Sequence, residues 1–338
     1  MPKYKMSDVA KAAGVSVATV SNVLNNKSLV AENTKKHVLE VAKEMGYTVD
    51  NAARALKTRK SNAIGFIVPD ISSVFFSILV RQVEEILEKN GYTLIVSNSL
   101  EKIERQKKHL LSFSTGMVDA IIIASCSSNL DEFQQYIPEN IPVLFIDRPV
   151  LNSIYSEISV NFRDALYKAT EDLLEKGFRN FGLIAGLKDW SLLDYRTLAI
   201  RDCLKHYDIP FDNNNILYIS DINLGAGPCA VELYKRHCQV IFTPNTNCTR
   251  EAMDALLEHG AIINEDVTLL AIQDDPKDRT KYGNMFPLVV QPTYEIAFQA
   301  ANQILRMLQN PEMRPITMRL AAEYRAVPQK AYYMKKWI

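Results

Sequence analysis

The sequence has too few cysteines and histidines, too widely scattered, for a disulfide framework or a zinc site. Five histidines are spread along 338 residues. The cysteines are odd in number and form no C-x-x-C pair: Cys126, Cys203, Cys229, Cys238 and Cys248. Proteins that depend on disulfides or structural zinc carry cysteines at recognisable spacings. We therefore expect reduced cysteines, no bound metal and no cofactor.

Long apolar runs are also missing. No stretch approaches the roughly 18 apolar residues that mark a membrane-spanning helix. The first residues, MPKYKMSDV, lack the apolar core of a signal peptide. These absences predict a cytoplasmic protein with no membrane partner. Because 47% of its residues are hydrophobic, the chain can still bury one or two substantial cores beside a small N-terminal unit.

The common catalytic motifs are absent as well. The sequence contains no G-x-G-x-x-G, no phosphate-binding P-loop, no G-x-S-x-G and no H-E-x-x-H. A single G-x-G, from Gly225 to Gly227, precedes Pro228 and is a weak signal. We expect that this chain is not an enzyme.

Acidic residues are scarce at one end of the chain. Residues 1–60 hold 11 Lys and Arg against 5 Asp and Glu, whereas the whole chain is balanced at 39 of each. Such asymmetry indicates an anionic partner for the N-terminal segment alone, although a basic tail can also be a solvated surface. Regular helical periodicity inside the segment argues against that second interpretation.

Residues 5–25, YKMSDVAKAAGVSVATVSNVLNN, predict two short helices joined by a tight turn. Ser7 and Ser16 are the expected N-caps, and Gly14 the expected left-handed residue between them. One face is apolar, with Val9, Ala10, Ala13, Val20, Val23 and Leu24. The opposite face of the second helix carries small and polar residues without acid, as a helix in the major groove requires: Ala18, Ser21, Asn22 and Asn25.

A third helix is expected from Ala31 to Met45, ended by Gly46. Two helices alone could be any αα-hairpin, but the third helix and the basic charge make that interpretation unlikely. The next segment, NAARALKTRKSN at 51–62, favours helix by composition yet is too short to be stable in isolation. We expect it to fold when it docks on a partner; a plain linker is the alternative.

From residue 63 the pattern changes to short β-branched runs that alternate with amphipathic helical stretches. The expected strands are 63–68, 93–97, 119–124, 142–146, 181–185, 216–219, 239–242 and 267–272. Two of the intervening helical stretches end at Gly91 and Gly260. This alternation predicts parallel sheets with right-handed crossovers, in two doubly wound halves that separate near residue 160. Ligands of such sheets bind at the carboxyl ends of the strands.

Several motifs together carry a resemblance to a known family. They are DVAKAAGVSVATVSNVLN at 8–25, GY at 46–47, ARAL at 53–56, IGFIVPDISSVFF at 64–76, DR at 147–148 and QPTYE at 291–295. With them the chain resembles the LacI/GalR family of bacterial transcriptional repressors over essentially its full length. The resemblance implies an α/β protein with a helix-turn-helix headpiece, a hinge helix and a core like periplasmic sugar-binding proteins.

The resemblance also implies domain limits. The headpiece would span 1–50, the hinge helix 51–62 and the effector-binding and dimerisation core 63–338. Within the core, one subdomain would comprise 63–160 and 292–319. The other would comprise 161–291 and 320–338.

The implied DNA-binding residues fall into three groups. The base-contacting positions are Val17, Ala18 and Asn22. The phosphate-contacting positions are Ser16, Thr19, Ser21, Asn25 and Thr34, which fix the register without recognising sequence. Ala53, Arg54 and Leu56 of the hinge would enter the minor groove. Two headpieces of a homodimer would bind two half-sites of a palindromic, double-stranded operator.

The implied effector site is formed by Phe75, Asp147, Arg196, Asn245, Gln273 and Gln291. The sequence departs from the family at Asn22 and Ala31, which replace an arginine and a capping serine, and at Val49, which replaces a proline. Near the effector, the departures are Asn161, Phe162, Thr246 and Gln273, several of which replace carboxylates. Losing carboxylates while keeping Arg196 predicts an anionic effector such as a sugar acid, anchored by Arg196. Asp147 and Asp274 weaken this prediction unless they orient Arg196 or bind hydroxyls, and a different neutral ligand or simple sequence drift is the alternative. Phe75 and Phe76 could equally belong to the core.

The sequence therefore predicts a regulator of carbohydrate genes, controlled by a small carbohydrate or sugar-acid effector. A regulator of the same fold controlled by a protein partner is the main alternative, because it would tolerate a degraded effector site. A non-exported sugar-binding protein is another. The C-terminal sequence AYYMKKWI has no leucine heptad, so a dimer is expected rather than a tetramer.

Overall fold

The computed structural model describes residues 4–24, 30–47, 60–186, 195–219, 225–274 and 285–327. The chain forms two compact units, Met1–Ser61 and Asn62–Ile338. We call the first the headpiece unit and the second the core unit.

The headpiece unit contains three helices, α1 Met6–Ala12, α2 Val17–Leu24 and α3 Glu32–Glu44. The predicted inward-facing residues of α1 and α2 form its core together with two residues of α3, and Leu24 is partly buried at the margin. The buried residues are Val9, Ala10, Ala13, Val20, Val23, Val38 and Ala42. The turn residues are confirmed, since Gly14 and Gly46 have φ angles of 65° and 63°. Apolar residues at helical spacing thus suffice to build this small unit.

The helix caps follow the prediction in two places and differ in one. Ser16 Oγ accepts a hydrogen bond from the Thr19 N–H at 3.0 Å, as an N-cap does. Ala31 precedes α3 without a side-chain cap, as expected. The prediction for Ser7 is wrong: Lys5 is the N-cap of α1, because the carboxylate of Asp8 accepts from the Lys5 N–H at 2.7 Å.

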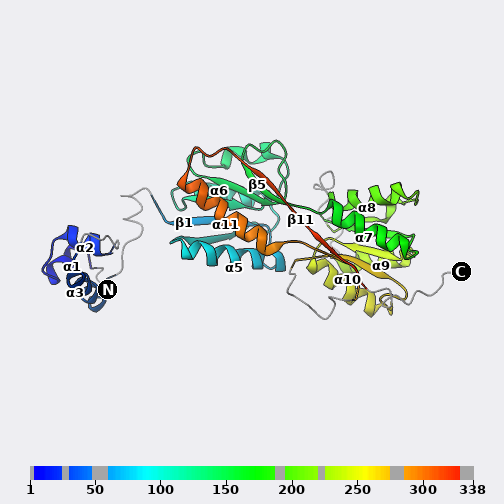
Figure 1. Cartoon of the computed structure of the whole chain (residues 1–338), viewed down its shortest axis with the longest axis horizontal. Coiled ribbons are helices and arrows are strands. Elements are labelled where there is room, and N and C mark those ends of the chain that lie inside the picture. Colours follow the sequence, from blue (N-terminus) through cyan, green and yellow to red (C-terminus); the bar gives the residue numbers. More distant parts are fainter. Residues whose placement is uncertain are drawn as a thin grey trace. The chain divides into compact units, whose positions relative to one another are not determined.

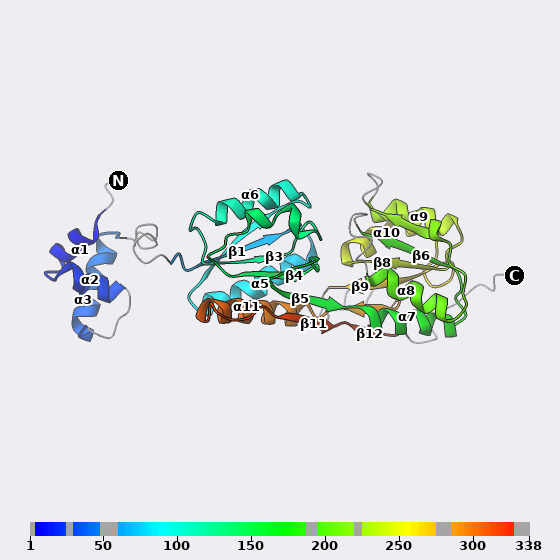
Figure 2. The same ribbon diagram turned by 90° about the horizontal axis from the view of Figure 1, so that it is seen from above.

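The first lobe of the core unit is a parallel six-stranded sheet in the order β11-β5-β4-β3-β1-β2. Its strands are β1 Ala63–Val68, β2 Thr93–Asn98, β3 Ala120–Ile123, β4 Val143–Asp147, β5 Ser156–Asn161 and β11 Thr317–Ala321. Helices α5 Val74–Lys89 and α11 Thr293–Gln309 cover one face, and α6 Ile103–Phe113 lies over the other (Figure 2). Two short 3-10 turns, Leu130–Glu132 and Gln134–Tyr136, lie beyond β3.

The second lobe has a six-stranded sheet in the order β12-β10-β9-β8-β6-β7, parallel except for the antiparallel pair β10–β12. Its strands are β6 Phe181–Ala185, β7 Ile216–Tyr218, β8 Val240–Thr243, β9 Thr268–Gln273, β10 Leu288–Val290 and β12 Glu323–Arg325. Helices α7 Arg163–Glu175 and α8 Tyr195–His206 pack on one face. Helices α9 Ala226–Lys235 and α10 Thr246–Glu258 pack on the other.

All eight predicted strands are present, with ends within about one residue of the prediction. Four strands were not predicted: β5, β10, β11 and β12. They connect the lobes, because the chain crosses between them after β5, after β10, and between β11 and β12 (Figure 1). Among the described residues, no helix is both long and apolar enough to span a membrane.

Candidate functional site

The outer face of α2 is the candidate DNA-binding surface. Val17 is 48% exposed, Ala18 is exposed, and Ser21 and Asn22 are half-buried. Helix α2 contains no charged residue at all. The structure thus presents the predicted base-contacting residues together on one accessible surface.

The structure describes some of the predicted phosphate-contacting residues and not others. Ser16 and Thr19 lie at the start of α2, where their hydroxyl oxygens are 2.8 Å apart. Thr34 is half-buried in the first turn of α3. Asn25 and the hinge residues Ala53, Arg54 and Leu56 lie outside the described residues, as does Val49. Their roles remain predictions.

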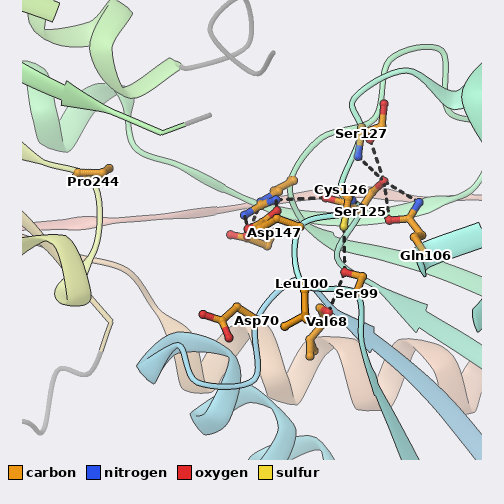
Figure 3. A network of polar contacts seen from close by, with 12 residues as sticks. Val68, Asp70, Ser99, Leu100, Gln106, Ser125, Cys126, Ser127, Asp147 and Pro244 are labelled. Atoms are coloured by element: carbon orange, nitrogen blue, oxygen red, sulfur yellow. Dashed lines mark hydrogen bonds and ion pairs between the residues drawn. The ribbon is translucent and has the colours of Figure 1, made fainter. Parts of the chain in front are cut away.

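A second candidate site lies where the carboxyl ends of the two sheets face each other. Asp147 ends β4 of the first lobe, with a φ angle of 67°. From the second lobe, Pro244 and Asn245 follow β8, and Asp274 follows β9. Figure 3 shows Pro244 on one side and Asp147 with Asp70 on the other. We call this region the inter-lobe junction.

Asp274 is the most enclosed acid of the junction, with 1% of its surface exposed. Its carboxylate accepts hydrogen bonds from the Thr246 N–H at 3.3 Å and from the Gln291 amide. In return its own N–H donates to the Thr246 hydroxyl at 3.1 Å, and its carbonyl accepts from Thr293. Burial raises the pKa of Asp274 to about 6, and the neighbouring charge of Asp147 adds to this effect.

Asp147 is coupled to charges on both lobes. Burial raises its pKa, while Arg148 and Arg196 oppose the rise. Arg148 itself forms a fork with the carboxylate of Glu101, at 2.6 and 2.7 Å. Glu101 and Leu100 both have left-handed backbone angles directly after β2. The fork thus ties the ends of β2 and β4 together beside Asp147.

Arg196 belongs to α8 of the second lobe. Its Nη1 donates to the Pro244 carbonyl at 3.1 Å, and its guanidinium lies 5.4 Å from the centre of the Phe162 ring. Phe162 was noted above as a departure from the family. Its ring supports the guanidinium through a cation–π contact, so this residue helps to position Arg196.

Two predicted effector residues, Asn245 and Phe75, have capping or packing roles, and a third, Gln273, is paired with Gln291 through the backbone. Asn245 is the N-cap of α10 and accepts from the Cys248 N–H at 2.9 Å. Phe75 is 4% exposed and packs edge-on against Phe76 in the first lobe's core, which supports the core interpretation. Gln273 is 9% exposed, and its carbonyl accepts from the Gln291 N–H at 3.0 Å.

Asp274 was not among the predicted effector residues, although a charged residue directly after a buried strand was a usable signal. Thr246 was noted only as a lost carboxylate. In the structure its partner is Asp274. The Thr246 hydroxyl accepts from the Asp274 N–H, and the Thr246 N–H donates to the Asp274 carboxylate. A carboxylate at 246 would instead repel Asp274.

The isolated G-x-G motif has a packing role. A Cβ atom on Gly225 would lie 2.5 Å from the Glu251 carboxylate, and one on Gly227 would lie 3.1 Å from the Glu251 carbonyl oxygen. The two glycines therefore let α9 approach α10 closely. Within the described residues, no group of three or more His, Cys, Asp and Glu side chains is arranged to hold a metal ion.

Two surface hollows lie away from the junction, each within one lobe. One, of about 510 Å³, is lined by α8 and the segment that follows it, including Leu198, Lys205 and Phe211. The other, of about 610 Å³, is lined by residues between β3 and β5, including Gln134, Ile154 and Tyr155. Neither brings side chains of both lobes together, so we regard the junction as the better candidate site.

Comparisons with known proteins agree with this two-unit arrangement. A family model described as "Bacterial regulatory proteins, lacI family" matches residues 5–50, and one described as "Periplasmic binding protein domain" matches residues 64–312. The HTH-type transcriptional regulator RegA of Clostridium saccharobutylicum is 28% identical over 313 residues, covering 91% of this chain and 93% of that protein. The ribose operon repressor of Halalkalibacterium halodurans is 31% identical over 309 residues, covering 89% of each.

A solved structure has the same fold. The lac repressor dimer bound to operator and an anti-inducer superposes with a TM-score of 0.82, covering 98% of this chain and all of that one, at 19% identity. Two parts of the expected architecture are present among the described residues, a small helical headpiece and a core of two doubly wound lobes. The predicted hinge helix at 51–62 lies largely outside the described residues.

Proposed function

Because the chain belongs to the LacI family of bacterial regulatory proteins, a family of DNA-binding transcriptional regulators and not of enzymes, we propose that it is a repressor of carbohydrate genes. It acts as a homodimer on a palindromic operator in the cytoplasm, and a small effector in the inter-lobe junction controls it. The observation that best supports the proposal is the combination of two features in one chain. The headpiece has an exposed, uncharged second helix, and the two-lobed core brings Asp147 and Asp274 together at its strand ends. The relative named as a ribose operon repressor supports the link to carbohydrate genes.

The mechanism follows from the two-lobe construction. An effector that contacts Asp147 of the first lobe and Arg196 of the second stabilises one arrangement of the lobes over another. That preference shifts the population of the state that holds both headpieces on DNA.

The test of the DNA-binding function is deletion of residues 1–60. The full chain should bind a palindrome whose half-site centres lie about one helical turn apart, with strong salt dependence. The deleted protein should lose this binding and still unfold cooperatively, since the core unit has its own sheets and clusters. Gel-shift titration and circular dichroism measure the two properties. Sequence-specific binding by the deleted protein would refute the proposal.

Charge at the junction bears on the effector class. Arg196 can bind a carboxylate through two parallel hydrogen bonds, which supports a sugar acid. However, the junction already holds more acids than guanidinium groups. The acids are Asp147, Asp274 and Glu101, and the guanidinium groups are Arg196 and Arg148, of which Arg148 is paired with Glu101. An added anion would therefore meet a net negative charge. Carboxylates accept hydrogen bonds from sugar hydroxyls without this penalty. We therefore favour a neutral carbohydrate, and Asp147, Asp274 and Arg196 as the residues that bind it.

A thermal-shift screen of the core unit separates the two classes, because a ligand that binds only the native state raises the melting temperature. Neutral sugars, beginning with ribose, should raise it, and Asp274→Asn should abolish the shift. A shift with sugar acids alone, lost in Arg196→Lys, would instead favour the acid.

A further inference from the structure

The three-helix part of the headpiece unit lacks the side chain that most often recognises guanine. The first arginine of the chain is Arg54, so residues 1–53 contain none. Arginine or lysine donating to O6 and N7 of guanine is the commonest specific contact in the major groove. Helix α2 also has no lysine, since its sequence is VATVSNVL. The described lysines of residues 4–47 lie on or beside the other helices: Lys5, Lys11, Lys35, Lys36 and Lys43.

The hydrogen-bonding groups of α2 indicate which of its side chains is suited to contact a base edge. The hydroxyls of Ser16 and Thr19 contact each other, and Ser16 Oγ also accepts from the Thr19 N–H. These groups are already used by the helix cap. Asn22 is the only residue of α2 with a carboxamide, which offers a donor and an acceptor side by side. It lies on the accessible side of the helix, between the buried Val20 and Val23.

The apolar part of the same surface lies at the start of α2. Val17 is 48% exposed and Ala18 is exposed. In a helix-turn-helix, the N-terminal residues of the second helix contact base edges. Small aliphatic side chains at these positions fit against the C5-methyl group of thymine, which is the apolar feature of the major groove.

We propose that α2 recognises A·T pairs in the half-site and no guanine. Asn22 forms a bidentate contact with N6 and N7 of an adenine, and Val17 and Ala18 contact thymine methyl groups. The lysines of α1 and α3 contact phosphates and carry no sequence information. This inference rests on the proposed function, because it requires α2 to lie in the major groove of an operator.

Selection from a random duplex library with the full-length protein identifies the half-site. Two base analogues then test the contacts one atom at a time. Replacing the adenine by 7-deazaadenine removes N7 and leaves the base pair intact. Replacing thymine by uracil removes only the methyl group. Each change at the contacted positions should weaken binding about fivefold or more, in keeping with the discrimination that such contacts provide.

Variants assign the effects to residues. Asn22→Ala should bind the adenine and 7-deazaadenine operators equally, and Asn22→Arg should shift the preference at that position toward guanine. Val17→Ser should lose sensitivity to the thymine methyl. Asn33→Ala is the matched control: Asn33 is exposed on α3, so its loss should leave the response to both analogues unchanged.

The outcomes are distinct. A selected half-site with a G·C pair whose recognition depends on Asn22 would overturn the inference and leave the proposed function standing. Equal binding of the normal and 7-deazaadenine operators at every adenine would do the same. Failure to enrich any motif would overturn the proposed function, and the inference with it.

Discussion

At the scale of single residues, the junction depends on Asp274. This acid is 1% exposed and held by Thr246 and Gln291, and its pKa of about 6 lies well above its ordinary value of 3.8. A group with a raised acid pKa holds its proton more tightly in the folded state than in the unfolded state. The ionisation of Asp274 therefore does not change the free energy of unfolding below the ordinary pKa, and it lowers this free energy as pH rises from there toward 6.

Replacing Asp274 by Asn isolates this effect. The free energy of unfolding of the wild type should fall relative to that of Asp274→Asn as pH rises from about 4 to about 6. The relative loss should be at most about 3 kcal/mol, because one pKa unit corresponds to about 1.4 kcal/mol. Urea denaturation at several pH values measures the difference. A difference that stays constant across this range would show that Asp274 does not titrate there.

At the scale of secondary-structure elements, helix α6 lies unusually close to strand β1 in the first lobe. Helix α6 packs on β1 through Phe113, and a Cβ atom on Gly65 would collide with the ring of that residue. The ring is 2% exposed and has little space to move. The glycine in the middle of β1 is therefore required by packing, although glycine normally weakens a strand.

Gly65→Ala should lower the stability of the core unit by about 1–3 kcal/mol, the usual cost of overpacking. Gly186→Ala is the matched control, because nothing lies within 4 Å of its added Cβ and its backbone needs no left-handed angle. That variant should stay within about 0.5 kcal/mol of the wild type. Thermal unfolding followed by circular dichroism compares them. Equal stability of the two variants would contradict this account of the α6–β1 contact.

At the scale of the whole molecule, the segment that joins the two units is predicted to strengthen binding to the operator. Leu56 lies outside the described residues, and its role comes from the family resemblance, which implies insertion into the minor groove at the operator centre. An apolar wedge stabilises a kinked duplex, whereas phosphate contacts do not depend on sequence. Loss of the wedge should therefore affect the operator more than random DNA.

Leu56→Ala should lower operator affinity by a few kcal/mol and change binding to random duplexes much less. Titrations of both DNAs at one salt concentration provide the comparison, because both affinities depend strongly on salt. Lys57→Ala is a suitable control, since loss of a lysine should weaken the two DNAs to a similar extent. Parallel losses in Leu56→Ala would exclude a wedge at this position.

The local features of this protein follow from its sequence alone. The three headpiece helices, the caps at Gly14 and Ser16 and the eight predicted strands all appear as expected, because they depend on short-range periodicity and backbone preference. Of the four missed strands, β10 and β12 have three residues each. Strands β11 and β12 alternate exposed and half-buried residues at the edges of their sheets. Such strands have little apolar signal of their own and form because a neighbouring strand offers hydrogen bonds.

The geometry of the candidate effector site depends on tertiary structure. The family resemblance implied a role for Asp147 and Arg196, whereas Thr246 and Phe162 were noted only as departures from the family. Folding brings Thr246 to Asp274 from two different strand ends, and Phe162 to Arg196 from two different helices. Burial then sets the pKa of Asp274, which no spacing along the chain predicts. Local sequence determined which elements form, whereas long-range packing determined which side chains meet and what chemistry they share.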